Sequence, residues 1–206
     1  MPNLITSARI VAAPLVTLLL LQSGAEAHFA AFALFLAAAL SDLWDGHLAR
    51  TRDQITSFGK IVDPLADKLL LLATLVPLYY VMSTRPELAG LPVFDAIPLW
   101  AVIVLLGREV LITVLRFFAA NRGDVVAARG VGKRKALAQN IFLGAGILWV
   151  GFRSPTFPEP SAQAWTWFSD FHGWFTTTLL AIALLLTVVS MVLYLRTFSR
   201  ILAGHS

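Results

Sequence analysis

Residues 42–67 read DLWDGHLARTRDQITSFGKIVDPLAD and set the architecture expected for the whole chain. Asp42 and Asp45 are three residues apart, and Asp63 and Asp67 are four residues apart. Residues at these spacings lie on one face of a helix. Two antiparallel helices joined by the segment between these pairs can therefore bring four carboxylates together.

These carboxylates lie in an unusually apolar chain. Of its 206 residues, 58% are hydrophobic and 14% are charged, against about 45–50% and about 25% in soluble domains. The mean hydropathy of +0.76 agrees. This composition excludes a disordered protein, a disulfide scaffold and an ordinary cytosolic enzyme. The absence of cysteine excludes thiol catalysis, zinc–thiolate sites and disulfides.

Six apolar stretches approach the roughly 20 residues that a membrane-spanning helix needs. They lie near residues 5–22, 28–50, 61–82, 95–120, 135–153 and 174–198. We therefore expect an all-α, polytopic membrane protein whose residues 1–206 form a single domain. The first stretch lacks a basic leader and a convincing cleavage site, so we expect a retained helix rather than a secretory signal. Residues 154–172, rich in Pro and Trp, are expected to form an interfacial extracytoplasmic loop.

The distribution of Lys and Arg predicts the orientation in the membrane. With six spans, both termini lie on one side, and that side holds Arg50, Arg52, Lys60, Arg122, Arg129, Lys133, Arg134, Lys135, Arg196 and Arg200. The opposite side holds only Arg85 and Arg153. The positive-inside rule then places both termini and the aspartates on the cytoplasmic side of a cell (inner) membrane. The net charge of +4 is explained by these loops, and no nucleic-acid partner is expected.

The four aspartates predict a metal site. Four carboxylates at close range cannot all stay ionised without cations. Because His47 is the only histidine nearby and there is no cysteine, the ligands are oxygens, which suit Mg²⁺, Mn²⁺ or Ca²⁺. Two such ions suit phosphoryl-type displacement. The alternative is structural: the aspartates pair with Arg50, Lys68 or Arg108, or cap helices.

The same stretch resembles the signature of the CDP-alcohol phosphotransferase family. That signature has two Asp three apart, then Gly, then Ala-Arg, a spacer, a Gly, and two Asp four apart. Every fixed position is present, as Asp42, Asp45, Gly46, Ala49, Arg50, Gly59, Asp63 and Asp67. Members of the family are membrane enzymes of six helices, which agrees with the six spans found independently.

The resemblance implies roles for individual residues. Asp42, Asp45, Asp63 and Asp67 would hold two divalent cations, Mg²⁺ or Mn²⁺, and Asp67 would also act as general base for the acceptor hydroxyl. The CDP group would be bound by Asn3, Thr6, Gly46, Ala49, Arg50, Thr56 and Gly59. Structural alternatives remain open: helix packing for Gly46, a snorkelling side chain for Arg50, and helix capping for Asn3 and Thr6.

A second basic cluster indicates the acceptor. Arg108 and Arg116 are eight residues apart, which places them on one helix face about two turns apart. Lys133 and Lys135 precede the fifth span. Inward-facing cations beside a metal site suggest a second phosphate. The alternatives are topology anchoring for the lysines and pairing with Glu109 or the aspartates for the arginines.

Three further motifs resemble the branch of the family that uses glycerol 3-phosphate. They are the opening Pro-Asn-Leu-x-Thr-x-x-Arg, an Arg-Glu stretch followed by Arg, and Gly-Lys-x-Lys, so the resemblance covers roughly residues 1–150. Ala136 departs from the pattern, because relatives often have Thr there. By this resemblance, the acceptor's phosphate would bind Arg108, Arg116, Lys133 and Lys135, and its C1 hydroxyl would face Asp67.

We therefore expect a homodimeric enzyme in the lipid bilayer that moves a phosphatidyl group from CDP-diacylglycerol to glycerol 3-phosphate and releases CMP. Alternatives within the family use phosphatidylglycerol, inositol phosphate or serine as acceptor, and the basic cluster disfavours serine. An alternative from another class is a divalent-cation transporter. A transporter predicts carboxylates on several helices near the midplane and often internal repeats, whereas no repeat is visible here.

Overall fold

The computed structural model describes residues 2–52, 57–121, 130–158 and 162–203. Within these ranges, the side chains of residues 2–6, 42–52, 57–65, 67, 120–121, 130–131, 133, 162 and 201–203 lie outside the description. The described residues form six α-helices: α1 (Pro2–Leu20), α2 (Ala25–Arg52), α3 (Ser57–Thr84), α4 (Leu99–Asn121), α5 (Gly130–Arg153) and α6 (Ala162–Ala203). The expected all-α architecture of six helices is confirmed, and the described residues contain no strand beyond an isolated bridge between Leu91 and Asp95.

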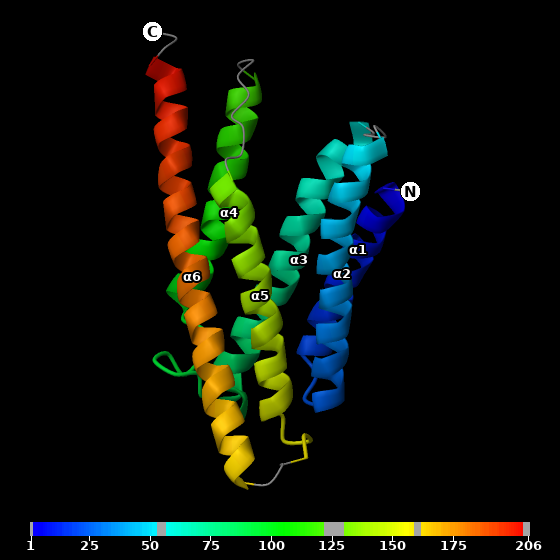
Figure 1. Ribbon diagram of the computed structural model, residues 1–206, viewed down its shortest axis with the longest axis vertical. Helices are drawn as coiled ribbons and strands as arrows, with labels where there is room; N and C mark the ends of the chain where they lie inside the picture. Colours follow the sequence, from blue (N-terminus) through cyan, green and yellow to red (C-terminus); the bar gives the residue numbers. More distant parts are fainter. Residues whose placement is uncertain (1, 53–56, 122–129, 159–161, 204–206) are drawn as a thin grey trace.

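The helices run roughly along one axis, and both termini lie at the same end of the bundle (Figure 1). The end of α2, the start of α3 and the end of α4 lie toward that same end. Helix α1 packs against both α2 and α3, and α5 packs against α2 and α6. This arrangement brings the start of α3 and the end of α2 together at the end that carries the termini.

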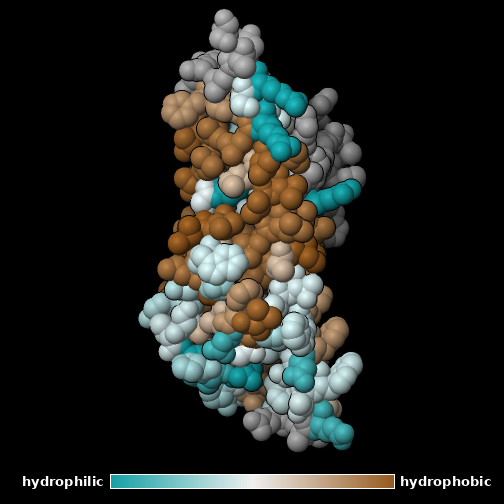
Figure 2. Space-filling view, turned by 90° about the vertical axis from the view of Figure 1, so that its left-hand side faces the viewer, coloured by the Kyte–Doolittle hydropathy of each residue, from teal (hydrophilic) through white to brown (hydrophobic). Residues whose placement is uncertain are grey.

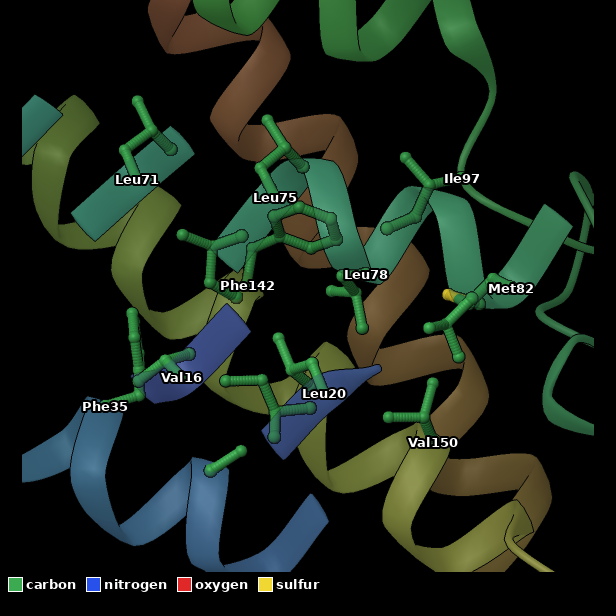
Figure 3. Close-up of a cluster of buried hydrophobic side chains, with 14 of the residues drawn as sticks. Val16, Leu20, Phe35, Leu71, Leu75, Leu78, Met82, Ile97, Phe142 and Val150 are labelled. Atoms are coloured by element: carbon green, nitrogen blue, oxygen red, sulfur yellow. The ribbon is translucent and has the colours of Figure 1, made fainter. Parts of the chain in front are cut away.

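One hydrophobic core joins the helices (Figure 3). Phe142 of α5 is fully buried among side chains of α1 and α3, including Leu20, Leu75 and Leu78. Burying a large apolar side chain contributes about 1.5–3 kcal/mol in water. The core thus fixes α5 against α1 and α3, which positions the polar residues that lie further along the same helices.

The exterior also carries many apolar side chains. Figure 2 shows a broad hydrophobic band across the middle of one face, with hydrophilic residues gathered toward the ends. Among the described residues, 134–153 and 163–200 are long and apolar enough to cross a membrane. Shorter apolar stretches cover residues 7–20, 25–41 and 68–84.

The prediction of a loop over residues 154–172 is wrong for its second half, because α6 begins at Ala162. Trp165, Phe168 and His172 follow one another on a face of α6, with ring centroids 5.7 Å apart in each successive pair. Phe152 of α5 packs edge-on against Phe168 at 5.1 Å. This aromatic packing stabilises a helix in the segment for which the Trp- and Pro-rich composition had predicted a loop. The resulting helix of 42 residues is about 63 Å long.

The close approach of α6 to α5 depends on Gly173. A Cβ at this position would lie 2.9 Å from Cδ of Pro92 and 3.1 Å from Cη2 of Trp149, both rigid rings. We expect Gly173→Ala to lower the free energy of unfolding by about 1–3 kcal/mol, because the rings must shift. Thermal unfolding of the purified protein, followed by circular dichroism, measures the change.

Gly107→Ala is the matched control, since a Cβ there meets no atom within 4 Å. That variant should be neutral or stabilised by up to about 1 kcal/mol, the difference in helix propensity. Equal unfolding temperatures for the two variants would contradict this account of the α5–α6 contact.

Candidate active site

A polar cavity of about 220 Å³ lies among the first five helices, in the half of the bundle that carries the termini. Each of these helices contributes to its wall. The lining residues are Arg9 of α1, Ala39 of α2, Lys68, Leu70 and Leu71 of α3, Glu109 and Arg116 of α4, and Lys135, Ala136, Gln139 and Asn140 of α5.

Glu109 organises one wall of this cavity. Its Oε1 accepts hydrogen bonds from Nζ of Lys135 and, at 3.1 Å, from Nη1 of Arg108. The three side chains are 17%, 5% and 10% exposed, so the ion pairs are shielded from solvent. A buried carboxylate that bridges two cations fixes their positions, because moving either one leaves an uncompensated charge.

Two further cations of the cavity, Lys68 and Arg116, are also held in place. Nζ of Lys68 donates a hydrogen bond to Oγ1 of Thr113, which itself donates to the backbone carbonyl of Glu109 at 2.6 Å. The guanidinium of Arg116 lies over the ring of Tyr194 on α6, 5.8 Å from its centroid. A cation over an aromatic face is attracted to it. The side chains are therefore arranged before any ligand arrives.

The charge balance of the cavity favours an anion. Among the lining residues that the structure describes, Arg9, Lys68, Arg116 and Lys135 are cationic, and Glu109 is acidic. Gln139 is 3% exposed, and its Nε2 has no hydrogen-bond partner within the described part of the chain. A buried donor without a partner costs about 1–3 kcal/mol. A phosphate would supply acceptors for donors of this kind.

The structure brings together only part of the predicted acceptor set. Arg116 and Lys135 line the cavity, as expected from the sequence. Arg108 does not line it and instead pairs with Glu109, which is the structural alternative considered for it. The side chain of Lys133 lies outside the described residues.

The predicted metal and CDP-binding residues can be placed only by their helices. The predicted residues on α2 are Asp42, Asp45, Gly46, Ala49 and Arg50. Those on α3 are Gly59, Asp63 and Asp67, and those on α1 are Asn3 and Thr6. The side chains of all these residues lie outside the described part of the structure. Thr56 lies outside it entirely. The backbone still relates the aspartates to the cavity, because Ala39 is three residues before Asp42 and Lys68 directly follows Asp67. Among the described residues there is no group of metal ligands.

Sequence reasoning missed several residues of the cavity. Neither Arg9 nor Lys68 was predicted to bind a substrate: Arg9 only ends the opening motif, and Lys68 was considered only as a structural partner of the aspartates. Gln139 lies four residues after Lys135, one helical turn away on the same face, and Asn140 follows it. This spacing from Lys135 was the available signal, since polar residues inside a membrane-spanning helix commonly mark function.

Removing the carboxylate of Glu109 tests this arrangement. We expect Glu109→Gln to destabilise the protein by about 3–5 kcal/mol, because Arg108 and Lys135 then lack their shared counter-charge. The melting temperature Tm of the purified variant measures this loss. Inorganic phosphate should raise the Tm of the variant more than that of the parent protein, since the anion replaces the lost charge.

Glu26→Gln is the control for this experiment, because Glu26 is an exposed glutamate in the first turn of α2. Surface changes of this kind usually alter stability by less than about 0.5 kcal/mol. A Tm for Glu109→Gln as high as that of the control would show that the buried pairs contribute no net stability.

Comparisons with known proteins identify the family of the chain. Residues 1–189 match the family model of the CDP-alcohol phosphatidyltransferases. The chain is 36% identical over 189 residues to the CDP-diacylglycerol–glycerol-3-phosphate 3-phosphatidyltransferase of Bacillus subtilis, covering 84% of this chain and 91% of that protein. It is 34% identical over 152 residues to the enzyme of the same name from Cereibacter sphaeroides, covering 71% and 64%.

A relative with a different name also matches. The chain is 31% identical over 210 residues to the cardiolipin synthase (CMP-forming) of Oryza sativa subsp. japonica, covering 98% of this chain and 58% of that protein. The chain therefore spans less than two thirds of two of these three relatives and nearly all of the Bacillus protein. The resemblance found in residues 42–67 is confirmed by the match over residues 1–189, and the chain belongs to the CDP-alcohol phosphatidyltransferase family.

Proposed function

We propose that this chain is a membrane enzyme that transfers a phosphatidyl group from CDP-diacylglycerol to sn-glycerol 3-phosphate, giving phosphatidylglycerophosphate and CMP. The printed names of the Bacillus and Cereibacter relatives support both substrates. The observation on this chain that carries the proposal is the polar cavity whose described lining includes the basic residues Arg116 and Lys135. An acceptor that brings its own phosphate matches that charge.

Arg116 and Lys135 would bind the acceptor's phosphate together with Arg9 and Lys68. Arg116 offers a planar fork of donors to phosphate oxygens. Lys135 is 4% exposed, so its charge is little screened by water. Lys133 would also bind the acceptor's phosphate. Arg108 would contribute indirectly, through its ion pair with Glu109. The phosphate would thus be held next to α3, where Asp67 precedes Lys68.

Asp42, Asp45, Asp63 and Asp67 would hold two divalent cations, Mg²⁺ or Mn²⁺, because their oxygen-only donor set fits hard ions. Bound cations would neutralise the charge of the donor's diphosphate. Asp67 would take the proton from the C1 hydroxyl of glycerol 3-phosphate. The hydroxyl oxygen forms a bond to the phosphatidyl phosphorus, the bond from that phosphorus to the CMP oxygen breaks, and CMP leaves.

The CDP group would lie along the start of α1, the end of α2 and the start of α3. Gly46 and Ala49 would let the nucleotide approach α2 closely, since neither has a bulky side chain. Arg50 would bind the diphosphate. Asn3, Thr6, Thr56 and Gly59 would complete the pocket, as the family resemblance implies.

All six helices would lie in the bilayer, with both termini and the site on the cytoplasmic side of the inner membrane. The hydrophobic band in Figure 2 and the two long apolar stretches support the embedding. The common end of the two termini in Figure 1 agrees with an even number of crossings. A homodimer remains part of the proposal, for which the family resemblance is the support.

The rice relative supports a second candidate, in which phosphatidylglycerol is the acceptor. An assay of the purified protein decides between them, using CDP-diacylglycerol with glycerol 3-phosphate, phosphatidylglycerol, inositol phosphate or serine in turn. We expect CMP release with glycerol 3-phosphate to exceed that with the others. Release with phosphatidylglycerol alone would overturn the assignment of the acceptor and leave the family chemistry standing.

A further inference from the structure

Gln139 of α5 carries a buried amide whose donor is not used by the fold. The side chain is 3% exposed, and its Nε2 donates to no acceptor within the described part of the chain. Burying a polar group without a partner is unfavourable, whereas an apolar side chain of the same length would be buried without this cost. Packing alone therefore does not account for a glutamine at this position.

The place of Gln139 on α5 marks the inner end of the polar cavity. It lines the cavity together with Lys135, which lies one helical turn closer to the start of α5 on the same face. The next residues on that face, Phe142 and Leu143, are fully buried and belong to the hydrophobic core. Along α5 the face thus changes from cationic to neutral polar to apolar. A ligand held by its charge at Lys135 can therefore meet an uncharged hydrogen-bonding group at Gln139.

The chemistry of an amide favours a hydroxyl as its partner. An amide offers both a donor and an acceptor, and a hydroxyl group does the same. Phosphate oxygens are better matched by the charged donors of Arg116 and Lys135, which also line the cavity. Lys135 and Gln139 are about 6 Å apart along the helix axis, which suits a small ligand. Gln139 is therefore placed to bind a hydroxyl on the carbon chain of a phosphorylated alcohol.

We propose that Gln139 binds the C2 hydroxyl of glycerol 3-phosphate and thereby determines which alcohol phosphates the enzyme accepts. This inference rests on the proposed function, in which Arg116 and Lys135 hold the phosphate on C3 and the C1 hydroxyl faces Asp67. The C2 hydroxyl is then the one polar group of the acceptor without an assigned partner. Gln139 supplies that partner from the inner end of the cavity.

A contact at C2 also makes the site stereospecific. C2 is the chiral carbon of glycerol 3-phosphate, and its mirror image, sn-glycerol 1-phosphate, carries the same groups at its two ends. Contacts to the phosphate and to the terminal hydroxyl alone are satisfied equally by both forms. A third contact, to the C2 hydroxyl, distinguishes them because that hydroxyl points to the opposite side in the mirror image. Gln139 would thus select the sn-3 form.

The test combines one variant with one substrate analogue. The analogue is 3-hydroxypropyl phosphate, which has the phosphate and the terminal hydroxyl of glycerol 3-phosphate but no C2 hydroxyl. For the parent protein, kcat/KM should be roughly tenfold or more lower with the analogue, because the buried amide is left without its partner. Gln139→Met, which keeps an unbranched side chain of similar length, should lower kcat/KM for glycerol 3-phosphate by a similar factor and leave that for the analogue nearly unchanged.

This non-additive pattern separates a contact at C2 from any other role of Gln139. A glutamine that binds the phosphate or only supports Lys135 would weaken both acceptors equally when replaced, and that result would overturn the proposal. Gln163→Met is the matched control, because Gln163 is an exposed glutamine in the first turn of α6 and does not line the cavity. The control should keep the parent's ratio of kcat/KM for the two acceptors. Gln139→Met should also reduce the preference for sn-glycerol 3-phosphate over sn-glycerol 1-phosphate several-fold.

Thermal unfolding provides two readouts that do not depend on turnover. The Tm of Gln139→Met should equal or exceed that of the parent protein, because the change removes a buried donor without a partner. A variant that unfolds would show that the fold does use this amide and would overturn the proposal.

Binding measured without the donor separates this inference from the proposed function. Glycerol 3-phosphate should raise the Tm of the parent protein more than 3-hydroxypropyl phosphate does, and Gln139→Met should lose this difference. This pattern in a protein that does not turn over glycerol 3-phosphate would refute the proposed function and support the role of Gln139. Turnover of glycerol 3-phosphate with equal losses for both acceptors in Gln139→Met would do the reverse.

Discussion

Replacing Asp42 or Asp63 by Asn is expected to abolish phosphatidyl transfer while leaving the protein folded in the membrane. Each change removes one negative charge and one strong ligand from the set that would hold two divalent cations. The loss should reach at least about a hundredfold, the upper range for a weakened metal site. CMP release from CDP-diacylglycerol, measured over a range of added Mg²⁺ and Mn²⁺, gives the magnitude.

Asp53→Asn is the matched control, because Asp53 belongs to the same stretch but occupies a spacer position of the family signature. This variant should keep its activity. Membrane extraction and thermal unfolding of all three variants show whether each is inserted and folded. Normal turnover by Asp42→Asn and Asp63→Asn without added divalent ion would refute the metal site.

The helices could be predicted from the sequence because long apolar runs leave few alternatives. Each of the six expected stretches overlaps one helix, although α6 begins 12 residues before the expected residue 174. That error arose because the stability of residues 162–173 comes from tertiary contacts. Trp165 and Phe168 pack on Phe152 of α5, and composition alone does not reveal which rings meet.

The candidate site, like the fold, could be predicted from the sequence only in part. The signature in residues 42–67 predicted the family, since it depends on local spacing within one hairpin of helices. The polar cavity is lined by five helices from distant parts of the chain, so spacing in the sequence could not predict which residues line it. Arg108 and Arg116 share a helix face in sequence, yet only Arg116 lines the cavity, because Glu109 engages Arg108. Arg9 and Lys68 line the cavity because α1 and α3 pack beside it.

Replacing Arg116 by Ala is expected to raise the apparent KM for glycerol 3-phosphate by roughly tenfold or more. Losing a hydrogen bond to a charged group costs about 1.5–3 kcal/mol, and about 1.4 kcal/mol corresponds to tenfold in binding. The KM for CDP-diacylglycerol should change little, because Arg50 and the aspartates are proposed to hold the donor's diphosphate. Initial rates with each substrate varied in turn measure both constants.

Two further variants separate recognition of phosphate from general effects of charge. Arg116→Lys should recover only part of the loss, because a point charge cannot reproduce the planar fork of donors. Arg196→Ala removes an exposed arginine of α6 that does not line the cavity, so its constants should match those of the parent protein. A rise in the KM for CDP-diacylglycerol alone would place the donor, rather than the acceptor, at Arg116. Because Arg116 also lies over Tyr194, Tyr194→Phe keeps the ring beneath the guanidinium and should leave the acceptor's KM unchanged.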